Sequence, residues 1–165
     1  MKIKVTFLLV ASFLINISCN INESKIITVT GEIPAGEIGK TLHHEHILVD
    51  FIGADSINFE RWNKEEVVEK VLPYLLEIKK MGYKTLVECT PEYLGRDPEL
   101  LKILSEKSGL QILTNTGYYS AMDAKFIPEK AFDETPEQIA KHWIDEAKTG
   151  IEGTGIFPGF IKISV

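Results

Sequence analysis

The residues of this chain best suited to metal chemistry lie in the run His43-His44-Glu45-His46. Side chains two residues apart on a strand share a face, so we expect His44 and His46 to point one way and His43 and Glu45 the other. Two neutral imidazoles on one face can chelate a divalent ion such as zinc and leave a position open for water. The pattern equally fits two hydrogen-bonded core histidines or an exposed edge.

The elements that must position these histidines alternate between strand and helix. A β-branched segment over 26–30, followed by glycines and Pro34, predicts a short hairpin. Strands are expected at 41–49, 84–88, 111–116 and 160–165, and helices at 65–80, 97–108 and 135–147. This alternation predicts an α/β fold with a parallel sheet, either doubly wound or closed into a barrel. The long connection over 117–134 is where a binding loop would lie.

Capping residues indicate where the helices begin and end. Asp97 and Gly109 are expected to cap the second helix, and Thr135 to open the third. Pro73 lies inside the first helix and predicts a kink or a local break. Cys89, at the end of the second predicted strand, is expected to be a small buried core residue.

The N-terminus reads as a targeting segment. Lys2 and Lys4 precede an apolar run over 5–15 that is shorter than the ~20 residues of a membrane-spanning helix. We therefore expect residues 1–18 to be a signal peptide of the lipoprotein type and Cys19 to be lipidated. Ordinary secretory cleavage and a buried N-terminal helix are the alternatives. The expected location is the periplasm or outer membrane of a bacterium, with membrane contact only through the lipid anchor.

Composition excludes several classes of protein. With 44% hydrophobic residues, 25% charged residues and two cysteines, the chain is neither a disordered tail nor a disulfide scaffold. A net charge of −6 without a basic block argues against nucleic-acid binding.

Several segments carry a resemblance to a known family. They are, in order, TLHHEHI at 41–47, LVECTP with LGRD at 86–97, TGYY at 116–119, GIE with TGI at 150–156, and GFIK at 159–162. From about residue 26 to its end the chain resembles the phosphotriesterase-related branch of the amidohydrolase superfamily. Members of that branch are metal-dependent (β/α)8 TIM barrels that hold two divalent ions, usually zinc.

The resemblance implies a role for four residues. His44 and His46 would hold the more buried ion, and Lys162 would bridge both ions after CO2 has carboxylated its amine. A carbamate offers two anionic oxygens, whereas a free ammonium cannot ligate a cation. Without the resemblance, Lys162 would be expected to be an exposed terminal lysine. Tyr119 matches a family position that lines the substrate pocket and is expected to contact the substrate; a core or surface aromatic is the alternative.

The implied reaction is hydrolysis of a small-molecule ester, lactone or phosphotriester. Activated water would attack while one ion polarises the electrophilic oxygen. Glu45, Glu88 and Arg96 are interpreted as supporting polar residues, with Arg96 and Asp97 forming at most a loop ion pair. The family also suggests a homodimer.

The length of the chain departs from the family. An intact barrel usually needs about 250 residues, and this chain has 165. We therefore expect residues 19–165 to be the N-terminal half of the barrel, strands one to four. The family's histidines on strands five and six and its aspartate on strand eight would be missing, so no catalytic set is complete and no turnover is expected. The alternative is a non-catalytic exported lipoprotein or binding module that retains half of the barrel.

Overall fold

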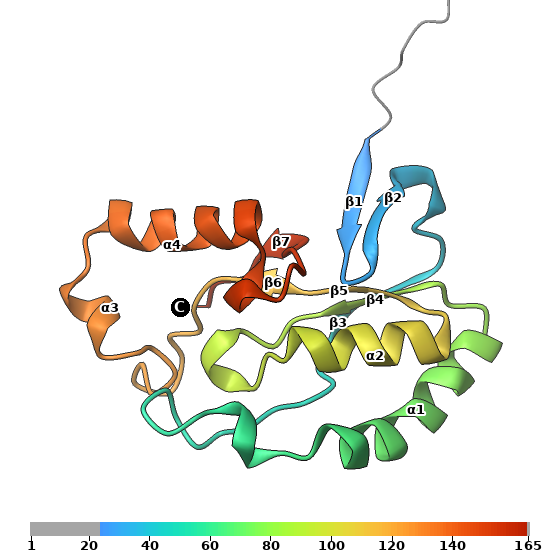
Figure 1. The fold of residues 1–165 in the computed structure, drawn as a ribbon, viewed down its shortest axis with the longest axis horizontal. Helices are drawn as coiled ribbons and strands as arrows, with labels where there is room; N and C mark the ends of the chain where they lie inside the picture. The colour runs from blue at the N-terminus through green and yellow to red at the C-terminus, as the bar shows by residue number, and fades with distance from the viewer. Residues whose placement is uncertain (1–23, 165) are drawn as a thin grey trace, which may run out of the picture.

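The computed structural model describes residues 24–164, and Figure 1 shows their arrangement. The expected signal peptide 1–18 and the expected lipidation site Cys19 lie outside the described residues. β1 (Lys25–Thr28) and β2 (Gly31–Pro34) form an antiparallel pair. Short 3-10 helices follow at η1 (Ala35–Glu37), η2 (Phe59–Arg61), η3 (Glu92–Leu94) and η4 (Ile151–Gly153).

Parallel strands and helices alternate along the rest of the described chain. The strands are β3 (Thr41–Glu45), β4 (Thr85–Glu88), β5 (Gln111–Leu113), β6 (Asn115–Thr116) and β7 (Phe160–Ile161). Strands β3, β4 and β5 pair in that order, and β6 pairs with β7, all in parallel. The helices are α1 (Lys64–Lys80), α2 (Pro98–Ser108), α3 (Lys130–Asp133) and α4 (Pro136–Thr149). The predicted mixed α/β fold with a parallel sheet is confirmed.

Three predicted strands are shorter or more divided than expected. Residues 111–116 do not form one strand, because the chain bends at Thr114, and β5 pairs with β4 while β6 pairs with β7. The carbonyl of Thr114 accepts a hydrogen bond from the amide of Gly159 at 2.8 Å, so the bend joins the two sheets. The first strand ends at Glu45, and the last covers Phe160–Ile161 with a bridge between Tyr119 and Ser164.

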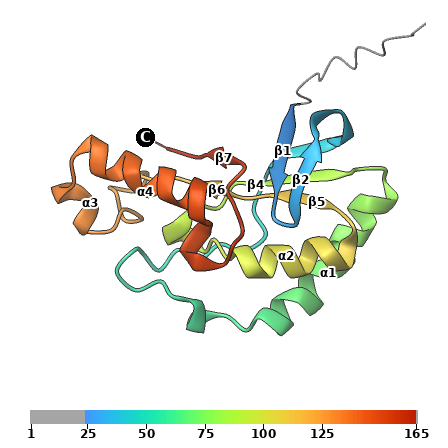
Figure 2. The same ribbon diagram turned by 45° about the horizontal axis from the view of Figure 1, so that its top comes forward.

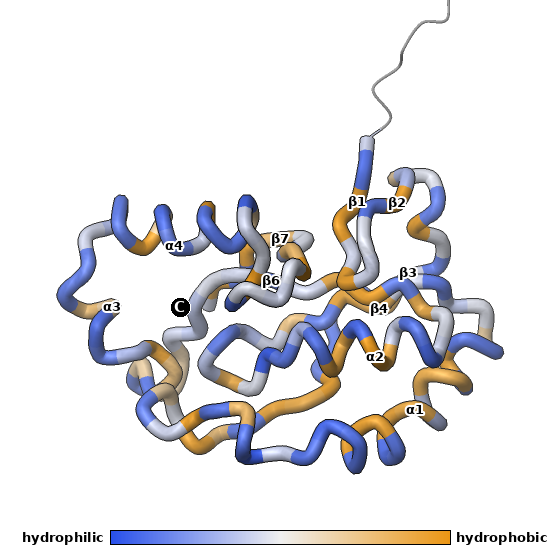
Figure 3. The backbone as a smooth tube through the Cα atoms, viewed as in Figure 1, coloured by the Kyte–Doolittle hydropathy of each residue, from blue (hydrophilic) through white to orange (hydrophobic). Residues whose placement is uncertain are grey.

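The core lies between the three-stranded sheet and the helices α1 and α2, which cover one of its faces (Figure 2). Apolar residues recur between polar ones along both helices (Figure 3). In a helix, apolar residues that recur every three or four positions form one apolar side, and this side packs on the sheet. Burying each leucine or isoleucine contributes roughly 1.5–3 kcal/mol. The buried core residues are Val29, Leu75, Leu86, Leu100, Leu101, Leu104, Leu110, Ile112 and Ile156.

The predicted helix caps are confirmed. The Asp97 carboxylate accepts from the Leu100 amide at 3.0 Å, Gly109 ends α2 at a φ of 70°, and Thr135 forms a capping box at α4. Of the two alternatives predicted at Pro73, a kink or a local break, the break is wrong, since α1 runs without interruption past it. The connection 117–134 is not wholly irregular, because it contains α3. Among residues 24–164 there is no helix with the length and apolarity to cross a membrane.

Candidate metal and substrate site

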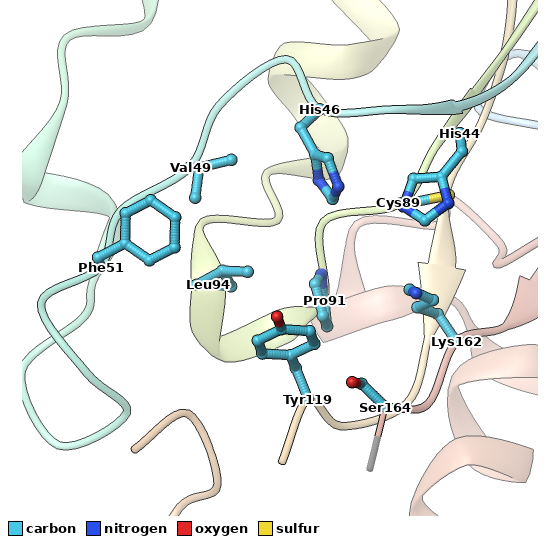
Figure 4. Close-up of a pocket in the computed structure, with 10 residues that line it drawn as sticks. All are labelled: His44, His46, Val49, Phe51, Cys89, Pro91, Leu94, Tyr119, Lys162 and Ser164. Carbon is cyan, nitrogen blue, oxygen red and sulfur yellow. The ribbon is translucent and has the colours of Figure 1, made fainter. Parts of the chain in front are cut away.

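A cavity of about 340 Å³ opens where the parallel strands end (Figure 4). Its walls come from residues at or just beyond the ends of β3, β4, β6 and β7. It brings together the four residues that the sequence singled out for the site, His44, His46, Tyr119 and Lys162. The lining residues are His44, His46, Val49, Phe51, Cys89, Pro91, Leu94, Tyr119, Lys162 and Ser164.

His44 and His46 both reach this cavity, although β3 ends at Glu45 between them. Their ring centroids are 5.3 Å apart and the rings are inclined at 60°. In Figure 4 both rings point toward the side of the cavity that also holds the Lys162 amine. The predicted common direction of the two imidazoles is therefore present.

Two polar residues at and just beyond the end of β4 orient His46. Thr90 Oγ1 lies 3.0 Å from His46 Nδ1 and donates to the carboxylate of Glu88. When the Glu88 carboxylate is ionised, the Thr90 hydroxyl donates to it and accepts the Nδ1 proton of His46. That tautomer leaves a lone pair free on Nε2. Glu88 is buried, and burial raises its pKa to about 7. Glu88 was expected to be a supporting residue; Thr90 was not foreseen.

The surroundings of His46 favour its neutral form. Burial lowers the pKa of His46, the nearby His44 lowers it further, and so does Lys162 while its amine is an unmodified ammonium. Neutral imidazole is the form that binds a metal ion. The lowered pKa therefore leaves His46 ready to act as a ligand at pH 7.

Lys162 comes directly after β7, and its amine lies on the same side of the cavity as His44 (Figure 4). Its amide donates to the carbonyl of Thr116 at 2.7 Å, which fixes the strand that carries it. The neighbouring Gly117 has a φ of +117°, and a Cβ there would lie 2.0 Å from the Lys162 carbonyl oxygen. Only glycine permits this close approach. Two imidazoles and an amine that CO2 can convert to a carbamate are donor types that fit a divalent metal site.

The other side of the cavity is apolar. Val49, Phe51, Leu94 and Tyr119 line it, and Figure 4 shows them away from His44 and Lys162. Cys89 is buried, as predicted, but its thiol also borders the cavity. The cavity thus has one end suited to a cation and its ligands and another suited to an apolar group.

A second polar cluster surrounds Arg96, whose side chain is fully buried. Its guanidinium binds both oxygens of Glu146 at 2.7 and 3.0 Å and approaches Glu152 at 3.3 Å. The expected pairing of Arg96 with Asp97 is therefore wrong, since Asp97 instead caps α2 and accepts from Trp62 at 2.9 Å. Glu146 and Glu152 lie 50 or more residues from Arg96, which no local pattern reveals.

Glu92, His142 and Glu146 meet beside Arg96, with potential ligand atoms within 4.8 Å of one another. The hydrogen bond between His142 and Glu92 measures 3.2 Å. Arg96 already occupies both oxygens of Glu146, so it supplies the positive charge that a metal ion would bring. We therefore interpret this cluster as a buried ion-pair network that holds η3 against α4.

Comparison with known proteins adds independent information. Residues 24–165 match the phosphotriesterase family. The chain is 29% identical over 132 residues to the aryldialkylphosphatase of Saccharolobus solfataricus, covering 80% of this chain and 41% of that protein. It is 30% identical over 164 residues to the N-acetyltaurine hydrolase of Bos taurus, covering 83% and 46%. The chain thus spans less than half the length of these relatives.

Solved structures agree with the sequence relatives. A double mutant of organophosphorus hydrolase from Deinococcus radiodurans superimposes with a TM-score of 0.69 at 30% identity, over 83% of this chain and 42% of that one. A resiniferatoxin-binding protein from Rhodobacter sphaeroides gives a TM-score of 0.67 at 25% identity, over 84% and 45%. Together with the family match over nearly all described residues, these likenesses show that the chain belongs to the phosphotriesterase family.

Proposed function

We propose that this chain provides the N-terminal part of the active site of a metal-dependent hydrolase. His44 and His46 would bind the more buried of two divalent ions, zinc in the first instance. Lys162, carboxylated by CO2, would bridge the two ions. When bound, such ions activate water and polarise the electrophilic oxygen of the substrate.

One observation carries this proposal. His44 and His46 at the end of β3 and Lys162 after β7 are more than a hundred residues apart in the sequence, yet they line one cavity. Three potential ligands that converge from two strands are more than a surface histidine pair would give. The contact of His46 Nδ1 with the Thr90 hydroxyl, at 3.0 Å, further supports a role as a ligand, because it orients the ring.

The substrate we propose is a small ester, lactone or phosphotriester. Relatives are named as an aryldialkylphosphatase and an N-acetyltaurine hydrolase, and a structural neighbour as an organophosphorus hydrolase. Tyr119 would contact the substrate from the apolar side of the cavity. There the substituent would be excluded from water while its carbonyl or phosphoryl group faces the ligands.

We further propose that the fold is the first half of a (β/α)8 barrel, with 19–165 as its domain. Two features support this: the share of each relative that the chain covers, and exposed apolar side chains beside the site. Ile161 and Ile163 are 63% and 59% exposed on either side of Lys162. Later strands of a barrel would cover such residues. Turnover would then require ligands from those strands, and the homodimer that the family suggests remains part of this proposal.

Zinc binding by the chain tests the metal site directly. We expect His44→Ala, His46→Ala and Lys162→Ala each to lower bound zinc, measured by elemental analysis after dialysis in bicarbonate buffer. His43→Ala is the matched control. In the part of the chain that the structure describes, His43 is not among the residues that line the cavity. Equal zinc content in all four variants and the parent chain would rule out this site.

Turnover is tested by assaying the 165 residues beside any longer product of the same gene, with zinc and bicarbonate added. We expect hydrolysis of a 4-nitrophenyl ester or phosphotriester only from the longer protein. Hydrolysis by the 165 residues alone would contradict the half-barrel proposal.

A second candidate, a non-catalytic exported lipoprotein or binding module, is favoured by the neighbour named for resiniferatoxin binding. It predicts that no product of the gene has turnover.

The proposed location follows from the sequence of residues 1–19. We propose export with 1–18 as the signal peptide and a lipid on Cys19, giving a periplasmic or outer-membrane lipoprotein. Labelling cells with a radioactive fatty acid tests this, because Cys19→Ser should abolish incorporation. Equal labelling of both proteins would contradict it.

A further inference from the structure

Phe126 is a fully buried aromatic residue that supports the cavity without lining it. Its ring centroid is 6.0 Å from that of Phe51 and 5.7 Å from that of Tyr119. Both of those residues line the apolar side of the cavity. They come from different loops, after β3 and after β6. Phe126 therefore packs behind two residues of the cavity wall, Phe51 and Tyr119, that are far apart in the sequence.

Hydrogen bonds next to Phe126 hold the loop of Phe51 in place. Lys125 Nζ donates to the carbonyl of Phe51 at 2.7 Å, and the Ala54 amide donates to the carbonyl of Lys125 at 3.0 Å. Gly53 has a φ of +114°, and a Cβ there would lie 3.3 Å from Lys125 Cε. The two loops are therefore joined at close range on both sides of Gly53.

A tight turn fixes Phe126 relative to Tyr119. Met122, Asp123 and Ala124 have left-handed φ values of 59°, 56° and 60°. The Ala124 amide donates to the carbonyl of Ser120 at 3.0 Å, which closes the turn. Left-handed conformations are unfavourable for residues other than glycine, so packing must hold this turn. It returns the chain so that Phe126 meets the Tyr119 ring.

We propose that Phe126 is a positioning residue that sets the spacing of Phe51 and Tyr119 and so limits the length of the apolar group the cavity accepts. The substrate class is then an ester or related compound with an unbranched alkyl or aryl substituent against these two rings. The inference rests on the proposed function only in treating the cavity as the substrate site. The packing of the three rings stands apart from any metal.

Binding of straight-chain carboxylates from acetate to octanoate tests this spacing without requiring turnover. These acids are products of ester hydrolysis, and ligand-observed NMR gives their affinities for the chain. Each methylene buried against the apolar wall should tighten binding about fourfold until the wall is filled. In Phe126→Leu we expect the affinity to keep rising for one or two carbons beyond the chain length at which the affinity of the parent chain stops rising. Phe132→Leu, at a phenylalanine that is 66% exposed, is the matched control and should follow the parent chain.

A second variant guards against misfolding of Phe126→Leu. Lys125→Met removes the hydrogen bond to the Phe51 carbonyl at an exposed position and should shift the length profile in the same direction. Circular dichroism verifies the fold of each variant. Identical profiles for the parent chain, Lys125→Met and any folded Phe126→Leu would overturn the inference, as would a parent chain whose affinity does not depend on length.

The same series, run with and without zinc, separates the two proposals. A length profile that moves with Phe126, in a chain whose zinc content does not depend on His44, His46 or Lys162, would refute the proposed metal function and support the positioning role. If zinc binding requires His44 and His46 but the dependence of affinity on carboxylate length is the same in Phe126→Leu and Lys125→Met as in the parent chain, the metal function is supported and the positioning role is refuted.

Discussion

The Thr90 hydroxyl lies 3.0 Å from His46 Nδ1 and connects that ring to the buried carboxylate of Glu88. The Glu88 carboxylate also accepts from the backbone amides of Ile47 and Thr90, at 3.3 and 3.1 Å. The end of β3 and the end of β4 are thus joined through the polar group that orients a proposed metal ligand. Such outer partners of a ligating histidine control how tightly the metal is held.

Thr90→Val should weaken zinc binding while leaving the fold intact. Valine has nearly the shape of threonine but has no hydroxyl, so the ring of His46 loses its hydrogen-bond partner at Nδ1. We expect the zinc affinity to fall by about 10- to 100-fold. Competition with a chromophoric chelator measures it. Thr90→Ser keeps the hydroxyl and should remain close to the parent chain; similar losses in both variants would contradict this role.

Removal of the Arg96 guanidinium should destabilise the protein strongly. Arg96→Met leaves the buried carboxylate of Glu146 without its partner, which costs about 3–5 kcal/mol. Urea unfolding monitored by circular dichroism gives the free energy. Arg61→Met is the control, because Arg61 pairs with Asp50 at the surface at 2.5 Å and should matter much less. Comparable losses of unfolding free energy in the two variants would show that the buried network stabilises the protein no more than a surface ion pair does.

The pair of His142 and Glu92 should make stability depend on pH. The hydrogen bond to Glu92 raises the pKa of His142 above its ordinary value of 6.5. Burial works to raise the pKa of Glu92, but His142 and Arg96 outweigh it and hold that pKa below 4.5. The contribution of His142 is complete below pH 6.5 and is lost as pH rises through its raised pKa. That of Glu92 is lost as pH falls through its lowered pKa.

His142→Gln should therefore cost more stability at pH 5.5 than at pH 9. The difference should stay below about 1 kcal/mol, because the ring is partly exposed to solvent. Urea unfolding at the two pH values measures it, and His43→Gln controls for loss of an exposed histidine. An equal cost at both pH values would mean that the charged pair contributes nothing.

Pro73→Ala should stabilise the protein. Pro73 lies in the interior of the continuous helix α1 and has no amide to donate to the preceding turn. Alanine restores this hydrogen bond, and the expected gain is about 1–3 kcal/mol after the added freedom of the unfolded chain is counted. Pro136→Ala is the control, since Pro136 opens α4, where no amide partner is needed. A gain at Pro136 alone would contradict the explanation.

Local features of the sequence were enough to predict much of the fold. The alternation of strands and helices, the caps at Asp97, Gly109 and Thr135, and the two histidines around Glu45 all depend on neighbours within a few residues. Such patterns follow from the geometry of a helical turn or a pleated strand. The predicted local break at Pro73 is absent because a proline inside a helix can be tolerated when tertiary packing stabilises the helix.

The supporting contacts of the site depend on residues far apart in the chain. Thr90 lies 44 residues from His46, and Glu146 lies 50 from Arg96. Phe126 has no feature in the sequence that distinguishes it from the exposed Phe132. Which buried aromatic packs behind the cavity, and which carboxylate meets an arginine, follows from how the helices and loops pack on the sheet. No periodic pattern in the chain encodes these distances, since packing arises from the combined shape of many side chains.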